Sequence, residues 1–164
     1  MRGFSLLFFA AFVLTNASAQ TVNPAFSVLL NSLLKKSVPV LSVHEAAQRR
    51  DALFVDAREA REFSVSHIAG ARLVGYSSFD VKSLSDINPD QPLIVYCSVG
   101  YRSERVGEQL MAAGFRNVYN LYGGIFEWVN QGLPVVDAQG KATQRVHAYD
   151  RMWGVWLQRG EKVF

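Results

Sequence analysis

The stretch Pro92-Leu-Ile-Val-Tyr-Cys97-Ser-Val-Gly-Tyr-Arg102-Ser103 decides the fold that we expect of this chain. An apolar run ends here in the only cysteine of the sequence, and a short segment with Gly100 leads to Arg102, Ser103 and a helical pattern. A short, continuously apolar run is typical of a strand buried on both faces of a parallel sheet. The stretch therefore predicts a strand, a cysteine, a tight loop and a helix N-terminus, in that order.

Strands and helices alternate on both sides of this stretch. Helices are expected over 44–50, 59–66, 103–113 and 125–131, and 77–87 is expected to be irregular or a short helix. Strands are expected over 38–43, 52–55, 71–74, 93–96 and 118–121. This alternation predicts one α/β domain with a largely parallel sheet, in which sites form beyond the carboxyl ends of the strands. Asp56 and Cys97 each follow such an end.

The first 19 residues have the layout of a secretory signal peptide. Arg2 supplies the positive charge, Leu6 to Leu14 is the apolar region, and Ala17-Ser18-Ala19 is a cleavage site before Gln20. An uncleaved membrane anchor is the alternative, although the apolar run is short for a span. We therefore expect an exported protein, periplasmic or secreted, with no stable membrane span after cleavage.

Composition and charge limit the function further. The chain of 164 residues fits one domain, and its net charge of +3 comes from scattered Lys and Arg, which predicts no nucleic-acid partner. A mildly basic balance helps to attract a small anionic substrate. One cysteine forms no intrachain disulfide, and a lone thiol in an oxidising compartment favours a reactive role for Cys97 over a structural one.

Both ends extend beyond the expected domain of residues 38–136. Residues 20–37 are predicted to be a helical extension, with Asn23 as the cap of a helix over 21–36. Residues 137–164 are predicted to be a linker and an amphipathic helix. This helix covers the domain, docks a protein partner or lies at a membrane interface. The helical spacing is carried by Val146, Tyr149, Met152, Trp153, Trp156 and Leu157.

The surroundings of Cys97 favour a thiolate. A free cysteine has a pKa of about 8.5, so a useful cysteine nucleophile needs help. The loop amides after Cys97, the positive end of the helix near Ser103 and the charge of Arg102 all favour an anion there. They equally favour an anionic substrate or a charged persulfide.

The chain resembles a single-domain rhodanese, a sulfurtransferase, over roughly residues 38–136. A lone C-x4-R pattern would be weak, but several motifs occur in the order of that family. The matching residues are Val55-Asp56-Ala57-Arg58, Glu62-Phe63, His67-Ile68-Ala69-Gly70-Ala71, Cys97-Ser98-Val99-Gly100-Tyr101-Arg102-Ser103, Leu121-Tyr-Gly123-Gly124 with Trp128, and Gly132-Leu-Pro134.

The resemblance implies a rhodanese-like fold, a five-stranded parallel sheet flanked by helices on both faces. It also implies that Cys97 takes a sulfane sulfur from a small anionic donor such as thiosulfate and passes it to a thiol or cyanide. The persulfide on Cys97 would be held by the loop residues Ser98, Val99, Gly100, Tyr101, Arg102 and Ser103. The resemblance implies no metal and no organic cofactor.

The neighbouring residues have two interpretations each. Asp56 and Arg58 could brace the site as an ion pair or help to bind substrate. His67 could be a general base or could organise the loop before the next strand. Ser103 could donate a hydrogen bond to a persulfide or cap its helix.

Two other functions remain open at this point. A Cys-based phosphatase or arsenate reductase resembles C-x5-R, a loop one residue longer than the C-x4-R of Cys97 to Arg102. A non-catalytic rhodanese-like module that binds a partner would need neither Cys97 nor Arg102.

Overall fold

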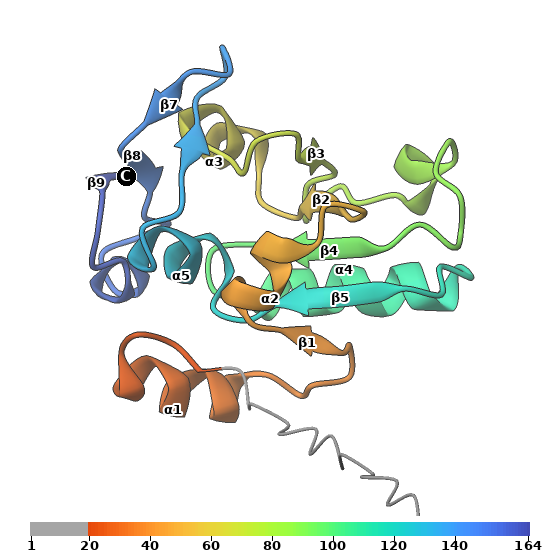
Figure 1. The fold of residues 1–164 in the computed structure, drawn as a ribbon, viewed down its shortest axis with the longest axis horizontal. Coiled ribbons are helices and arrows are strands. Elements are labelled where there is room, and N and C mark those ends of the chain that lie inside the picture. Colours follow the sequence, from red (N-terminus) through yellow and green to blue (C-terminus); the bar gives the residue numbers. More distant parts are fainter. Residues whose placement is uncertain (1–19) are drawn as a thin grey trace, which may run out of the picture.

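Five parallel strands form the central sheet of this protein, in the order β1-β5-β4-β2-β3 (Figure 1). The computed structural model describes residues 20–164, so the predicted signal peptide of residues 1–19 lies outside the described part. The strands are β1 (Val40–Leu41), β2 (Leu53–Asp56), β3 (Arg72–Leu73), β4 (Leu93–Tyr96) and β5 (Val118–Leu121). The predicted α/β fold with a five-stranded parallel sheet is confirmed.

Helices cover both faces of the sheet, as predicted. They are α1 (Pro24–Leu33), α2 (Val43–Gln48), α3 (Ala60–Val65), α4 (Tyr101–Ala112) and α5 (Gly124–Asn130), with short 3-10 helices η1 (Val81–Leu84) and η2 (Trp153–Trp156). Alternate residues of β4 sort into two cores, because successive side chains of a strand point to opposite faces. Ile94 and Tyr96 pack with α2 and α5, and Leu93 and Val95 pack with α4 and η1.

The strand register brings the carboxyl ends of β2 and β4 together. Asp56 pairs with Tyr96, so Cys97 follows β4 directly beside the end of β2. The arrowheads of β4 and β5 point toward α5 and the C-terminal strands, which gather at that end of the sheet (Figure 1). Cys97 and Asp56 thus lie at the edge where the alternation of elements predicted a site.

Local signals explain where the helices begin. Asn23 accepts a hydrogen bond from the backbone N–H of Ala25 at the start of α1, and Ser42 forms a capping box with Glu45 at the start of α2. Helix α4 begins two residues before the predicted start. Gly100 has φ of 113°, a left-handed conformation that glycine adopts readily, and the helix therefore begins at Tyr101.

The predicted amphipathic helix over residues 146–157 is wrong. The chain after the domain forms a hairpin of β6 (Val135–Val136) and β7 (Ala142–Thr143), then a parallel pair of β8 (Arg145–His147) and β9 (Glu161–Val163), with η2 between them. Tyr149 has φ of 66°, which no α-helix accommodates. The helix-like apolar spacing of this segment has another cause: strand β8 buries Val146, and the turns that follow bury Leu157, on the same domain.

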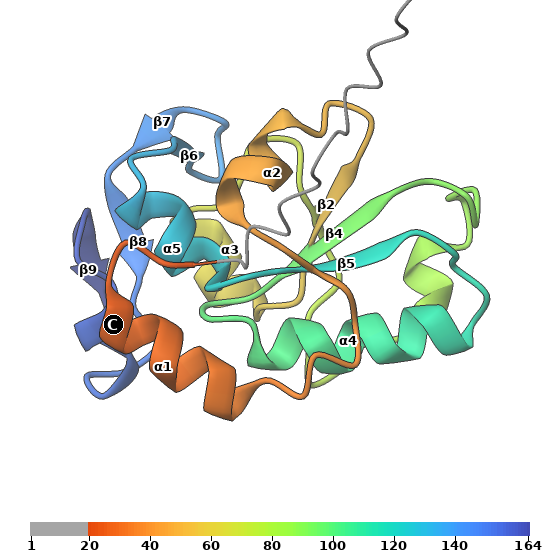
Figure 2. The same ribbon diagram turned by 60° about the horizontal axis from the view of Figure 1, so that its bottom comes forward.

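The two ends of the described chain lie against each other. Figure 2 shows α1 beside the C-terminal segment, and the ring of Phe26 in α1 stacks on that of Trp156, with centroids 5.2 Å apart. Trp156 thus packs against α1 of the same chain and does not belong to an exposed helix that could dock a partner. Across residues 20–164, none of the helices has the length and apolar character that a membrane span requires.

Candidate functional site

The loop after β4 is held in shape by the start of α5. The backbone N–H of Ile125 donates to the carbonyl of Cys97 at 2.9 Å, and that of Phe126 donates to the carbonyl of Ser98 at 3.1 Å. Both carbonyls are therefore turned toward α5. Gly124 lies so close to them that it has no room for a side chain, as its φ of 58° and its contacts indicate.

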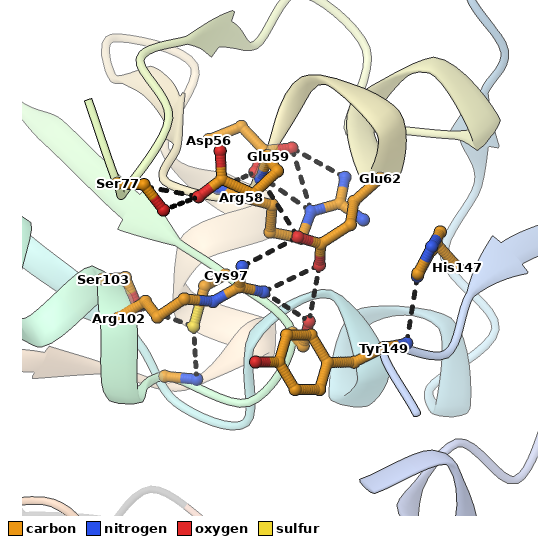
Figure 3. A network of polar contacts seen from close by, with 12 residues as sticks. Asp56, Arg58, Glu59, Glu62, Ser77, Cys97, Arg102, Ser103, His147 and Tyr149 are labelled. Atoms are coloured by element: carbon orange, nitrogen blue, oxygen red, sulfur yellow. Dashed lines mark hydrogen bonds and ion pairs between the residues drawn. The ribbon is translucent and has the colours of Figure 1, made fainter. Parts of the chain in front are cut away.

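The sulfur of Cys97 faces the interior of this loop. It accepts a hydrogen bond from the backbone N–H of Gly100 at 3.2 Å, and the hydroxyl of Ser103 lies 3.6 Å away (Figure 3). Gly100 directly precedes α4, whose positive end favours a negative charge on the sulfur. Cys97 is only 1% exposed, so these contacts act in a largely water-excluded place.

Asn120 at the end of β5 positions two of these groups. Its side-chain carbonyl accepts the Ser103 hydroxyl at 2.7 Å, and its N–H donates to the carbonyl of Gly100 at 3.0 Å. Ser103 therefore does not cap α4 but points toward Asn120 and the sulfur. A polar residue in the buried strand β5 is the signal that could have identified Asn120 from the sequence.

Arg102 forms a two-pronged ion pair with the buried carboxylate of Glu62. Its two terminal nitrogens lie 2.7 Å from the two oxygens of Glu62, and one also donates to the hydroxyl of Ser98 at 3.0 Å (Figure 3). Burial alone would raise the pKa of Glu62, but the hydrogen bonds and the charge of Arg102 lower it below its ordinary value. Glu62 was part of the quoted motifs, but its place in the site was not predicted.

We expect Arg102→Ala to destabilise the fold as well as the site. The substitution leaves the Glu62 carboxylate buried without its ion partner, which should lower the free energy of unfolding by about 3 kcal/mol or more. Urea unfolding measures the loss, and adding Glu62→Gln to Arg102→Ala should restore part of it. A loss below about 1 kcal/mol would show that the pair does not brace the loop.

Tyr149, in the C-terminal segment, covers the outer side of Arg102. The guanidinium of Arg102 lies 4.9 Å from the ring centre of Tyr149, and the backbone N–H of Tyr149 donates to Nδ1 of His147 at 3.1 Å (Figure 3). This hydrogen bond needs an unprotonated Nδ1. Burial lowers the pKa of His147 and favours this neutral form. Glu62 opposes that shift, and the arginines 61, 58 and 102 add to it.

Acid should therefore weaken the fold through His147. The unfolded imidazole has its ordinary pKa of 6.5 and the folded one a lower value, so the unfolded chain binds more protons as the pH falls below about 6.5. The free energy of unfolding should fall between pH 7.5 and 5.5, measured with urea. His147→Asn keeps an acceptor without this titration and should show a smaller fall. An equal fall in both proteins would contradict the assignment.

The three predicted supporting residues form no hydrogen bond to the sulfur, whose partners are Gly100 and Ser103. Arg58 and Asp56 form a fully buried ion pair, 2.7 Å between Nη2 and Oδ2, and Nη2 of Arg58 also donates to the carbonyl of Ser66. The ring of His67 stacks on Phe63, and its backbone pairs with Val136. None of the three predicted residues lines the cavity over Cys97, so their contacts brace the domain around the loop.

A cavity of about 630 Å³ opens over Cys97. It includes four of the predicted loop residues, Ser98, Val99, Tyr101 and Arg102, whereas Gly100 and Ser103 contact the sulfur from behind. Its other lining residues were not predicted as site residues: Leu33, Glu59, Arg61, Tyr76, Ser77, Tyr149 and Trp153. Among residues 20–164, no cluster of His, Cys, Asp and Glu could hold a metal ion.

The arrangement suits a cysteine nucleophile that carries a group in the cavity. The Gly100 N–H and the positive end of α4 stabilise negative charge on the sulfur or on an atom attached to it. The geometry does not favour the phosphatase alternative. Both terminal nitrogens of Arg102 bind Glu62, so the guanidinium is not directed at an oxyanion in the loop.

Comparisons with known proteins agree with this geometry. A family model, Rhodanese-like domain, matches residues 41–131. The thiosulfate sulfurtransferase GlpE of Glaesserella parasuis is 36% identical over 91 residues, which are 56% of this chain and 83% of that protein. A tRNA uridine(34) hydroxylase of Photorhabdus laumondii is 34% identical over 102 residues, but the match spans 57% of this chain and only 29% of that protein.

A solved structure shares the fold. The crystal structure of a rhodanese-like domain protein from Staphylococcus aureus superposes with a TM-score of 0.51 at 25% identity, over 58% of this chain and 95% of that one. Like the family match, this likeness covers little more than half of the chain, and residues 20–40 and 132–164 lie outside the family match.

Proposed function

We propose that this chain, which belongs to the rhodanese-like sulfurtransferase family, transfers sulfane sulfur through a persulfide on Cys97. The donor in this proposal is a small anion such as thiosulfate, and the acceptor is a thiol or cyanide. The observation that carries the proposal is the position of the Cys97 sulfur. It lies at the base of a cavity and accepts a hydrogen bond from the N–H of Gly100.

The proposed reaction has two steps, and each breaks one bond to sulfur and forms another. The Cys97 thiolate attacks the outer sulfur of thiosulfate, the sulfur–sulfur bond of thiosulfate breaks, and sulfite leaves with the electron pair. An acceptor then attacks the outer sulfur of the persulfide, and Cys97 leaves as a thiolate. The Gly100 N–H and the positive end of α4 support the negative charge in both states.

Mass spectrometry of the intact protein tests the first step. After incubation with thiosulfate and removal of the excess, the protein should gain one sulfur atom, and peptide mapping should place it on Cys97. Addition of cyanide should remove it and release thiocyanate. A chain that gains no sulfur from thiosulfate, polysulfide or an organic thiosulfonate would contradict the proposal and favour a non-catalytic module.

We further propose that the protein acts outside the cytoplasm, on the strength of the signal-peptide pattern in residues 1–19. In a bacterial host, the mature protein should be recovered from the periplasm with Gln20 as its first residue. N-terminal sequencing measures this, and recovery of an uncleaved chain in the cytoplasm would contradict it.

A further inference from the structure

We propose that the cavity over Cys97 selects one class of sulfur acceptor, an organic thiol that joins an apolar or aromatic body to an anionic group. The inference rests on the proposed function and goes beyond it, because it names which thiol the site is shaped to receive. Three properties of the cavity carry it: its apolar wall, its one uncommitted cation and its size.

Half of the apolar wall comes from outside the family match. Leu33 belongs to α1, and Tyr149 and Trp153 belong to the C-terminal segment, whereas the match covers residues 41–131. The other half lies within the match and consists of Tyr76, Val99 and Tyr101. The segments at both ends of the described chain therefore contribute to the surface that an acceptor must pass to reach Cys97.

This wall is packed rather than loosely attached. Asn130 in α5 donates to the carbonyl of Trp156 at 2.9 Å and accepts the backbone N–H of Gln158 at 2.7 Å. The Phe26–Trp156 stack ties the same segment to α1. A preformed wall binds a flat or branched body at a smaller entropic cost than a flexible one would.

Arg61 supplies the uncommitted positive charge of the cavity. Within residues 20–164, the Arg61 guanidinium forms no hydrogen bond or ion pair, whereas Arg102 is held by Glu62. Glu59 also lines the cavity, but its carboxylate accepts the N–H and the hydroxyl of Ser77. Arg61 is thus the group able to receive a carboxylate or sulfonate of the acceptor.

The size of the cavity points to the same class. Pockets of roughly 300–1,000 Å³ are typical of sites for drug-sized ligands, and this cavity of about 630 Å³ is larger than cyanide or thiosulfate requires. In the transfer step, the acceptor thiolate attacks the outer persulfide sulfur and the bond from that sulfur to Sγ breaks. Cys97 departs as a thiolate, and the product is an organic persulfide.

The test measures the second step alone, on full-length protein whose persulfide has first been verified by mass. Three thiols are compared, and each rate is divided by the uncatalysed rate of the same thiol with a small disulfide, because their thiolate fractions differ: 4-(mercaptomethyl)benzoate, benzyl mercaptan without the anion, and 3-mercaptopropionate without the ring. We expect 4-(mercaptomethyl)benzoate to exceed each of the others by about 5-fold in corrected kcat/KM, because a ring contact and an exposed ion pair each contribute about 1 kcal/mol at most. Failure of the protein to load would instead contradict the proposed function.

Variants assign the preference to the wall and to the cation. Trp153→Ala should reduce the preference for the ring, and Arg61→Gln should reduce the preference for the anion. Met152→Ala is the matched control, because Met152 is 76% exposed and does not line the cavity, and it should leave both ratios unchanged. The inference is overturned if loaded wild-type protein shows no preference among the thiols, or if Trp153→Ala and Arg61→Gln slow all three thiols and cyanide equally.

Discussion

Replacing Cys97 with serine should lower the rate of sulfur transfer by about 1,000-fold or more. A serine hydroxyl is a far weaker nucleophile at neutral pH than a thiolate, and it forms no persulfide with thiosulfate. Initial rates of thiocyanate release measure the loss. Because Cys97 is the only cysteine, the variant has no thiol. Any gain in mass that the variant shows after incubation with thiosulfate is therefore the background of the mass-spectrometric test.

The same substitution should leave the domain folded. Serine is close in size to cysteine, and its oxygen can accept the N–H of Gly100 in place of the sulfur. The free energy of unfolding should change by less than about 1.5 kcal/mol, measured with urea. Substantial transfer by a folded Cys97→Ser protein would refute the role of Cys97, whereas an unfolded variant would be replaced by Cys97→Ala for the same measurement.

Gly124→Ala should be the most damaging small substitution near the site. A Cβ at Gly124 would lie 2.7 Å from both the carbonyl carbon and the oxygen of Ser98, and these are backbone atoms that cannot rotate away. The φ of 58° adds strain of about 1–2 kcal/mol. The loop must move or the start of α5 must open, so we expect a loss of about 3 kcal/mol or more in the free energy of unfolding.

Gly140→Ala is the matched control for this effect. Gly140 also has a positive φ, 75°, near the left-handed region of Gly124, but a Cβ there would meet nothing within 4 Å. Its substitution should cost only the backbone strain and should leave the transfer rate of the folded protein unchanged. Urea unfolding and thiocyanate release on both variants separate strain from contact. Equal losses in the two variants would mean that the contact between α5 and the loop contributes nothing.

The sequence predicted well those parts of the fold that local patterns control. The bounds of β4 and β5 are as predicted, because continuous apolar runs mark strands buried on both faces. The place of Cys97 followed from the order strand, cysteine, loop and helix. The partners of the loop, Glu62, Asn120 and Tyr149, did not follow. Each contacts Arg102 or Ser103 across 17 to 47 residues of chain, through packing that no local pattern encodes.

The C-terminal helix shows where periodicity fails. Spacing by three and four residues fits a helix, but it fits equally a strand and two turns that bury their apolar side chains on one surface. Two features decided between them: Tyr149 in the left-handed region, and buried Gly154, where a Cβ would lie 3.2 Å from that of Ala148. Both depend on the tertiary contacts of the segment.

The contribution of Tyr149 and Trp153 to the site has a consequence for biosynthesis. A ribosome releases the chain from its N-terminus, so the last strand of the sheet, which ends at Leu121, emerges some 28 residues before Tyr149, which covers Arg102. A nascent chain can thus hold the thiol within a formed sheet while the entrance to it is still uncovered. Acceptor discrimination is then the last property that the growing polypeptide acquires.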